Sequence, residues 1–204
     1  MRLGIFGGSF DPVHLGHLLL AEACREQAAL DRVLFVPTNT QPHKLHHQPA
    51  PNAARVEMLQ LAVQGNPAFA VESLELDRGG VSYTVETLSE LKRRDPASEL
   101  FFLMGADSLA DFPNWREPQR ICELATLLVV QRAGQSPPDY SALEPFLAPA
   151  QIAAWQAQQI DLPPIAISST ELRNRVASGR SIRYRTPRAV EMLIAERKLY
   201  RGTS

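Results

Sequence analysis

Hydrophobic residues in this chain gather in short runs, and between the runs apolar and polar positions recur at helical spacing. The short runs predict strands at Leu3–Phe6, Arg32–Val36, Phe69–Leu74, Leu100–Met104, Thr126–Val130 and Ile165–Ile167. The stretches between and after them predict helices at Leu15–Ala29, Ala53–Gln64, Thr84–Arg94, Glu117–Leu124, Tyr140–Gln158, Ser169–Ser178 and Pro187–Glu196. Strands and helices that alternate in this way are typical of an α/β fold with a doubly wound, mostly parallel sheet. Two of the strands are apolar nearly throughout, as expected where helices cover both faces of the sheet.

The 204 residues fit a single domain, because domains contain roughly 150 residues each. We expect a core sheet over about 1–132 and a C-terminal part over about 165–204. Pro37–Asn52 is rich in proline, histidine and amide side chains, so it predicts a loop, and Ala133–Asp139 predicts a second one. No internal repeat, low-complexity tract or convincing interdomain linker is visible.

The charge balance argues against two classes of partner. The chain carries 21 basic and 22 acidic side chains, so it has no basic field that would favour nucleic acid or a membrane surface. Cys24 and Cys122 lie far apart in predicted helices and indicate neither a disulfide framework nor a zinc site. Without a signal-peptide pattern or an apolar run long enough for a bilayer, we expect a cytoplasmic protein. A homo-oligomer is compatible with this composition.

The first candidate for chemistry is the run Gly7-Gly8-Ser9-Phe10-Asp11-Pro12-Val13-His14-Leu15-Gly16-His17, between the first predicted strand and helix. The paired glycines lack a Cβ and allow the backbone to turn and approach a ligand closely. A turn at this position is where doubly wound folds bind phosphate. Because they are three residues apart, His14 and His17 lie on one face of the first helical turn and can hydrogen-bond phosphate oxygens.

The second candidate lies late in the chain, at Ile167-Ser168-Ser169-Thr170-Glu171-Leu172-Arg173. A Ser/Thr cluster that opens a helix caps its N–H groups, and by itself this is the usual interpretation. The same helix start also attracts a phosphate group, with Arg173 as a charged clamp. Each motif alone is ambiguous, but a chain that carries both favours phosphate chemistry.

Three further segments narrow the interpretation: Pro37-Thr38-Asn39-Thr40-Gln41-Pro42-His43-Lys44, Ser82-Tyr83-Thr84-Val85-Glu86-Thr87-Leu88 and Gly105-Ala106-Asp107-Ser108-Leu109. Together with the two motifs above, they resemble the nucleotidyltransferase superfamily and, within it, the bacterial nicotinate-nucleotide adenylyltransferases. The resemblance spans the chain except for 134–163. It implies a Rossmann-like nucleotidyltransferase fold with C-terminal helices. The implied reaction is adenylyl transfer from ATP to nicotinate mononucleotide, with release of pyrophosphate, in NAD biosynthesis.

The resemblance implies catalytic roles for His14, His17 and Arg173, which would stabilise charge on the phosphates without a covalent intermediate. The implied ATP site comprises Gly7, Gly8, Ser9, Phe10, His14, His17, Gly105, Asp107, Arg132, Ser168, Ser169, Thr170 and Arg173. Asp107 is placed to bind ribose hydroxyls or to cap the following helix, and Arg132 to lie along the adenine ring. We interpret Asp11 as a turn residue whose carboxylate accepts from local N–H groups.

The implied mononucleotide site comprises Asn39, His43, Lys44, Tyr83, Thr84 and Trp115. Thr84 stands where a helix N-cap is expected, and free N–H groups there suit a pyridine carboxylate better than a carboxamide. Trp115 either stacks on the pyridinium ring or packs in the core. The family commonly has a second proline where this chain has Gln41, which bears on loop rigidity more than on activity.

Mg²⁺ is the implied cofactor, and it would be carried by ATP, because this ion binds mainly to substrate phosphates and keeps its waters. No dedicated carboxylate cage for it is visible in the sequence. His43, His46 and His47 lie in a predicted loop without partner ligands, so we predict no protein-bound metal site.

Other functions remain as alternatives. A related adenylyltransferase would act on nicotinamide mononucleotide or phosphopantetheine. The Ser82–Leu88 segment and Trp115 argue against the pantetheine enzyme. A nucleotide-sensing module without catalysis is a different class, and intact His14, His17 and Arg173 argue against it. A fragment of a class I aminoacyl-tRNA synthetase shares the His-x-Gly-His pattern, but this chain is too short and too neutral to hold tRNA.

Overall fold

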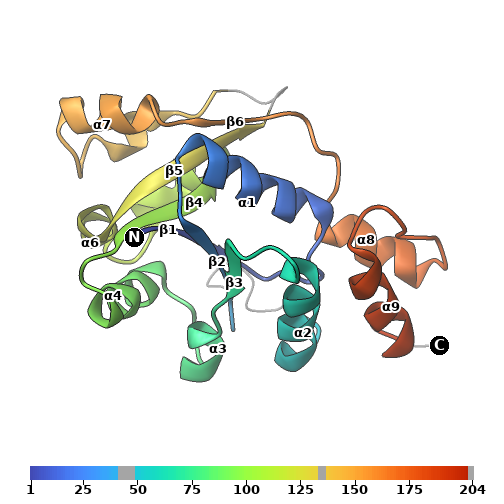
Figure 1. Ribbon diagram of the computed structural model, residues 1–204. Coiled ribbons are helices and arrows are strands. Elements are labelled where there is room, and N and C mark those ends of the chain that lie inside the picture. The colour runs from blue at the N-terminus through green and yellow to red at the C-terminus, as the bar shows by residue number, and fades with distance from the viewer. Residues whose placement is uncertain (41–48, 133–136, 202–204) are drawn as a thin grey trace.

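Parallel strands form one sheet in the computed structural model, which describes residues 1–40, 49–132 and 137–201 (Figure 1). In these residues the sheet has six strands in the order β3-β2-β1-β4-β5-β6. They are β1 (Arg2–Gly8), β2 (Arg32–Pro37), β3 (Phe69–Val71), β4 (Glu99–Gly105), β5 (Ala125–Arg132) and β6 (Ile160–Leu162). Ile5 of β1 pairs with Leu34 of β2 and with Phe102 of β4, so the winding reverses beside β1. The predicted Rossmann-like, doubly wound parallel sheet is confirmed.

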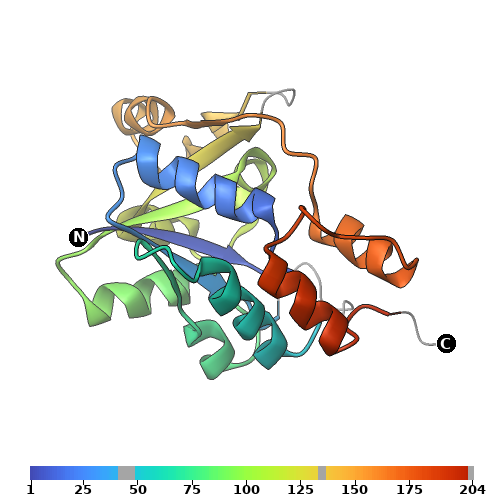
Figure 2. The ribbon, with the colours of Figure 1, turned by 45° about the vertical axis from the view of Figure 1, so that its right-hand side comes forward.

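Helices cover both faces of this sheet. The longer ones are α1 (Leu15–Gln27), α2 (Asn52–Val63), α4 (Thr84–Arg94), α6 (Pro118–Leu124), α7 (Pro149–Gln156), α8 (Ser169–Ala177) and α9 (Arg188–Glu196). The shorter ones are α3 (Leu74–Arg78), α5 (Ala106–Asp111) and the 3₁₀ turns η1 (Phe112–Asn114) and η2 (Tyr140–Leu143). Figure 2 shows α1, α2 and α9 together on one side of the sheet.

Side chains of β4 alternate between the two layers, as the pleat of a strand requires. Phe101 and Leu103 belong to the core under α1, α2 and α9, whereas Phe102 and Met104 belong to the core under α4 and α6. Both cores are therefore built from continuous apolar strands, in line with the hydrophobic runs of the sequence.

The last strand lies earlier than predicted. The hydrophobic runs predicted it at Ile165–Ile167, but β6 is Ile160–Leu162, paired with Val130–Arg132 of β5. Pro163 and Pro164 follow it and cannot donate ladder hydrogen bonds. Ile165 and Ile167 are partly buried and pack against the core outside any strand.

Other predicted elements also differ in extent. Instead of one helix over Tyr140–Gln158 there are η2 and α7, because Pro145 and Pro149 interrupt the helical hydrogen bonds. The strand predicted to end at Leu74 ends at Val71, and Leu74 begins the short helix α3. Neither α3 nor α5 was predicted. Across the described ranges, none of the helices combines the length and apolar character needed to cross a bilayer.

Candidate active site

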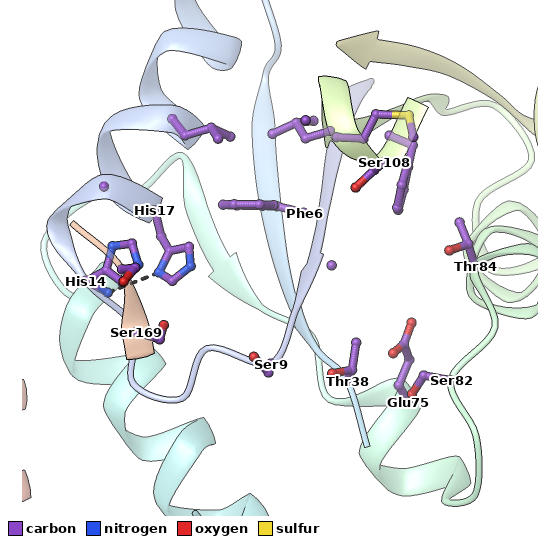
Figure 3. Close-up of a pocket in the computed structure, with 18 of the residues that line it drawn as sticks. Phe6, Ser9, His14, His17, Thr38, Glu75, Ser82, Thr84, Ser108 and Ser169 are labelled. Carbon is purple, nitrogen blue, oxygen red and sulfur yellow. Dashed lines mark hydrogen bonds between the residues drawn. The ribbon is translucent and has the colours of Figure 1, made fainter. Parts of the chain in front are cut away.

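A pocket of about 830 Å³ opens at the carboxyl ends of β1 and β4, where the winding of the sheet reverses (Figure 3). Doubly wound folds bind their ligands at this position. Its volume suits a small organic ligand, for which pockets are typically about 300–1,000 Å³. The predicted site residues that line it are Gly7, Ser9, His14, His17, Tyr83, Thr84, Gly105, Trp115, Ser168, Ser169, Thr170 and Arg173.

His14 and His17 lie side by side at the start of α1. Their rings stack with centroids 3.6 Å apart and planes inclined by 22°. The backbone N–H of His14 donates to Nδ1 of His17 at 3.2 Å, so the neutral His17 ring carries its proton on Nε2. His14 is buried and His17 half-buried. The pair therefore presents fixed imidazoles to the pocket.

Gly16 makes room for the His14 ring. A Cβ on Gly16 would lie 3.0 Å from Nδ1 of His14 and 3.3 Å from a methyl carbon of Ile165. The glycine between the two histidines thus leaves room for the His14 ring, and a Cβ there would force its neighbours to shift by a few tenths of an ångström.

The N-terminus of α8 docks directly on the histidine motif. Ser168 caps this helix by accepting from the N–H of Glu171 at 3.1 Å. The Ser169 hydroxyl donates to the carbonyl oxygen of Pro12 at 2.9 Å. Arg173 donates from Nη1 to the carbonyl oxygen of Asp11 at 2.7 Å and from Nη2 to Thr170 Oγ1 at 3.2 Å. The two sequence motifs therefore form one wall of the pocket.

The segment after α8 strengthens this junction. Thr186 donates from its hydroxyl to the carbonyl oxygen of Val13 at 2.8 Å. The N–H of Leu15 donates to the carbonyl oxygen of Arg185 at 2.9 Å. Backbone groups at the start of α1 are thus held by the C-terminal part of the chain.

Asp11 lies in a turn, as the sequence predicted, but its carboxylate also accepts from donors far along the chain. Its carboxylate is buried and Oδ1 accepts from the N–H of Ala50 at 3.1 Å and from the hydroxyl of Tyr200 at 2.6 Å. Both donors are distant in the sequence. The sequence pattern indicated the turn but did not reveal these long-range donors.

Gly8 and Phe10 serve the core rather than the pocket. A Cβ on Gly8 would lie 3.1 Å from the ring of Phe10, which is fully buried among Phe6 and Phe35. Gly7 and Ser9 do line the pocket. The predicted approach of backbone to ligand is therefore available at Gly7 and not at Gly8.

The N-terminus of α4 forms the opposite wall. The N-cap is Tyr83 and not Thr84, which is the first helical residue, so the predicted cap was one position late. In the described part of the chain, the Tyr83 side chain makes no capping hydrogen bond, and Ser82, Tyr83 and Thr84 all line the pocket. Uncapped N–H groups and the helix dipole make such an end suitable for an anion.

Trp115 lies between the core and the pocket. Its ring meets Phe102 edge-on at 5.8 Å and Phe112 at 5.6 Å, and its side chain is half-buried. The two interpretations of this tryptophan are thus compatible, since one part packs in the core and another part lines the pocket.

Glu75 is a pocket residue that the sequence did not reveal. It belongs to α3 and is 4% exposed, and its Oε1 accepts from the Thr87 hydroxyl. Burial raises the pKa of this carboxyl, and the hydrogen bond from Thr87 opposes that rise. No pattern in the sequence points to Glu75, because the helix α3 that carries it was not predicted.

Arg116 also lines the pocket without having been predicted. Its guanidinium lies 4.6 Å from the centre of the Tyr83 ring, and Nη1 pairs with Glu86 at 3.0 Å. Glu86 also pairs with Arg78 at 3.3 Å. In the sequence, only the polar character of the residues around Trp115 indicated that Arg116 could line a pocket.

Some predicted residues lie outside the pocket. Asn39 donates from its side chain to the carbonyl oxygen of Gly80 at 2.8 Å and from its backbone N–H to the Ser82 hydroxyl at 3.0 Å, so it braces the pocket rim. Asp107 is exposed in the first turn of α5, whose N-cap is Gly105 and not Asp107. Arg132 ends β5, and its side chain lies outside the described part, as do the whole of His43 and Lys44.

Within ranges 1–40, 49–132 and 137–201, no three His, Cys, Asp or Glu side chains are grouped closely enough to hold a metal ion. His46, His47 and Gln41 lie outside these ranges. The described site instead offers imidazoles, a guanidinium and a helix N-terminus on one wall, and a second helix N-terminus on the other. A ligand with an anionic group at each end and an uncharged segment between them would fit this arrangement.

Comparison with known proteins agrees with this geometry. A family model described as cytidylyltransferase-like matches residues 5–175. A protein of Thermus thermophilus is 48% identical over 201 residues, which cover 98% of this chain and 100% of the relative. One from Rhodopirellula baltica is 46% identical over 199 residues, covering 98% and 93%. Both relatives are named probable nicotinate-nucleotide adenylyltransferase.

Solved structures share the fold. The nicotinic acid mononucleotide adenylyltransferase of Plasmodium falciparum, complexed with NaAD, superposes with a TM-score of 0.73 at 17% identity. That match covers 98% of this chain and 97% of the other. A putative nicotinate-nucleotide adenylyltransferase from Vibrio parahaemolyticus gives 0.70 at 20% identity, covering 100% and 98%.

Proposed function

Since this chain belongs to the cytidylyltransferase-like family and, within it, to the nicotinate-nucleotide adenylyltransferases, we propose that its pocket joins ATP to nicotinate mononucleotide. A phosphate oxygen of the mononucleotide attacks the α-phosphorus of ATP. The bond from the α-phosphorus to the bridging oxygen breaks, and pyrophosphate leaves. The product is nicotinate adenine dinucleotide, an intermediate of NAD biosynthesis.

One observation carries the proposal for the donor side: Ser169 and Arg173 hydrogen-bond to Pro12 and Asp11, so that both motifs face one pocket. His14, His17 and Arg173 would bind the triphosphate and stabilise the charge that builds up on the leaving pyrophosphate. Ser168, Ser169 and Thr170, at the N-terminus of α8, would hold the terminal phosphates. We assign these residues the catalytic and ATP-binding roles.

The nucleoside of ATP would lie along the ends of β1 and β4. Gly7 and Ser9 would place backbone groups beside it, and Gly105 leaves open space, since no atom of the described residues lies within 4 Å of a Cβ built there. Asp107 is assigned to the ribose from its place in the first turn of α5, which follows β4. Arg132 keeps its assignment to the adenine from its place at the end of β5.

The acceptor would lie against α4. Its ring carboxylate would accept from the uncapped N–H groups near Tyr83 and Thr84, and Trp115 would stack on the pyridinium. Asn39 supports this wall through Gly80. We assign His43 and Lys44 to binding of the acceptor phosphate only from their place in the Pro37–Lys44 motif. A carboxamide brings its own N–H₂ toward the same donors, so the acid is the better ligand.

A divalent ion fits this donor set only as part of the substrate. The described residues supply no cage, and Mg²⁺ characteristically binds phosphate oxygens while keeping several waters. Bound to the triphosphate, it would neutralise charge on the phosphate oxygens. The protein residues would contribute the rest of the catalysis by aligning the acceptor phosphate with the α-phosphorus and by binding the leaving group.

Pyrophosphate release tests the acceptor directly. The purified chain would be supplied with ATP and Mg²⁺ and with nicotinate mononucleotide, nicotinamide mononucleotide or phosphopantetheine in separate reactions. We expect the highest kcat/KM with the acid mononucleotide and no turnover with phosphopantetheine. Faster turnover of the amide would overturn the acceptor assignment.

A further inference from the structure

The chain beyond α9 turns back to the histidine motif. Lys198 and Tyr200 both adopt left-handed backbone angles, with φ of 53° and 60°. Non-glycine residues rarely adopt this conformation, and it is retained where the surrounding structure demands it. This turn brings the Tyr200 hydroxyl to Oδ1 of Asp11, 189 positions earlier, at 2.6 Å.

The Asp11 carboxylate stands close to the arginine of the proposed phosphate clamp. Its Oδ2 lies 3.8 Å from Nη1 of Arg173, the same atom that donates to the Asp11 carbonyl oxygen at 2.7 Å. The guanidinium of Arg55, which is fully buried, also interacts electrostatically with Asp11. The carboxylate therefore lies within ion-pair distance of the same guanidinium that lines the pocket.

We propose that Tyr200 is a positioning residue for adenylyl transfer, which holds the Asp11 carboxylate so that Arg173 stays directed at the triphosphate. This inference rests on the proposed function, because it takes Arg173 as a phosphate ligand. Burial is the main cause that raises the pKa of Tyr200, and the nearby Asp11 raises it further. The phenol therefore remains a hydrogen-bond donor across the working pH range.

The tail is docked by contacts that do not need the hydroxyl. Arg197, next to α9, pairs with Glu57 of α2, and the buried side chains of Val190 and Ile194 pack α9 against the core. The N–H of Leu199 donates to the carbonyl oxygen of Ile194 at 3.0 Å. Removal of the hydroxyl alone therefore isolates its effect on Asp11 from the folding of the tail.

The test compares Tyr200→Phe with Tyr184→Phe, since Tyr184 is 83% exposed and lies outside the pocket. Calorimetry with α,β-methylene-ATP measures affinity without turnover, and steady-state kinetics give KM for each substrate. We expect Tyr200→Phe to weaken binding of the analogue and raise KM for ATP by about fivefold to tenfold, which is what one hydrogen bond contributes. In Tyr200→Phe, KM for the mononucleotide should stay within about twofold of wild type. In Tyr184→Phe, analogue affinity and both KM values should stay within the same range.

A second pair of variants separates positioning from a structural role. In an Asp11→Asn background no carboxylate competes for Arg173, so adding Tyr200→Phe should leave analogue affinity unchanged. Unchanged ATP affinity in Tyr200→Phe, or an equal loss in the Asp11→Asn background, overturns the proposal. A Tyr200→Phe protein that fails to fold would also overturn it, since the tail would then depend on the hydroxyl. Failure of the proposed function looks different, because wild type would bind the analogue yet not adenylylate nicotinate mononucleotide.

Discussion

The imidazole rings of His14 and His17 stack with their centroids 3.6 Å apart, and the neighbouring Gly16 has no Cβ to press on the His14 ring. This contact joins the two histidines into one stacked pair at the start of α1. Because α8 docks on the same loop, the N-terminus of a second helix lies beside the pair at the proposed phosphate site.

His17→Ala should nearly abolish pyrophosphate release while leaving the fold intact. Loss of one preorganised donor to developing charge typically lowers kcat by about a hundredfold to a thousandfold. His17→Asn retains a hydrogen-bond donor and should lose less. Turnover of the alanine variant close to wild type, with an unchanged circular dichroism spectrum, would refute the catalytic role.

Gly16→Ala should lower kcat without a matching loss of stability. The new Cβ would lie 3.0 Å from Nδ1 of His14, so the ring must move. Alanine in a helix is favoured over glycine by about 0.5–1 kcal/mol, which offsets part of the clash. We expect at least a tenfold drop in kcat, roughly the effect of 1.4 kcal/mol on the barrier. An unaltered kcat would show that the position of His14 does not matter.

Thr84→Pro should weaken acceptor binding selectively. Thr84 is the first residue of α4, where proline is well tolerated, and Tyr83 before it has φ −108° and ψ 129°, which a following proline also accepts. The change removes one N–H that the ring carboxylate would use. A hydrogen bond to a charged group contributes about 1.5–3 kcal/mol, so KM for nicotinate mononucleotide should rise at least tenfold.

Thr84→Ala is the matched control for that variant, because it removes the side chain and keeps the N–H. It should bind the mononucleotide almost as wild type does. KM for ATP should be unchanged in both variants. If alanine and proline weaken the acceptor equally, the backbone N–H is not its ligand.

Glu75→Gln should change the pH dependence of stability. Burial raises the folded-state pKa of Glu75 above its ordinary value of 4.5, so the unfolded chain ionises first as pH increases. Wild type should therefore lose stability relative to Glu75→Gln from about pH 4.5 up to the raised folded-state pKa and stay constant above it. Across that interval, each increase of one pH unit should lower the free energy of unfolding of wild type by about 1.4 kcal/mol relative to the variant.

Urea unfolding at a series of pH values measures this difference. Arg78 and Glu86 are the charged groups that also act on Glu75, and both are retained in the variant. A stability difference that does not vary with pH would contradict the burial argument.

The regular elements could be predicted where the sequence carries several agreeing signals. Helix α4 begins and ends at the predicted residues, because an amphipathic pattern, an acidic first turn and a basic last turn coincide there. β6 could not be predicted, since Ile160–Leu162 contains Asp161, whereas the equally short Ile165–Ile167 is wholly apolar, and only pairing with β5 identifies the strand. Helices as short as α3 and α5 do not show a helical period.

The candidate site was predictable where it follows from local motifs. The sequence pointed to His14, His17, Ser169 and Arg173 because each motif shows the context of a helix start and the two motifs together resemble a known family. The roles of Asp11 and Tyr200 depend on a hydrogen bond across 189 positions, which no local pattern contains. Long-range contacts of this kind arise only when the fold brings both ends of the chain together.

Label transfer from ATP distinguishes adenylyl transfer from phosphoryl transfer and from hydrolysis. Wild-type protein would be incubated with Mg²⁺, nicotinate mononucleotide and ATP labelled with ³²P at either the α- or the γ-phosphorus. Adenylyl transfer predicts that the α-label appears in nicotinate adenine dinucleotide and the γ-label in pyrophosphate. Transfer of the γ-label to the mononucleotide, its release as orthophosphate, or an α-label that never leaves ATP would contradict the account.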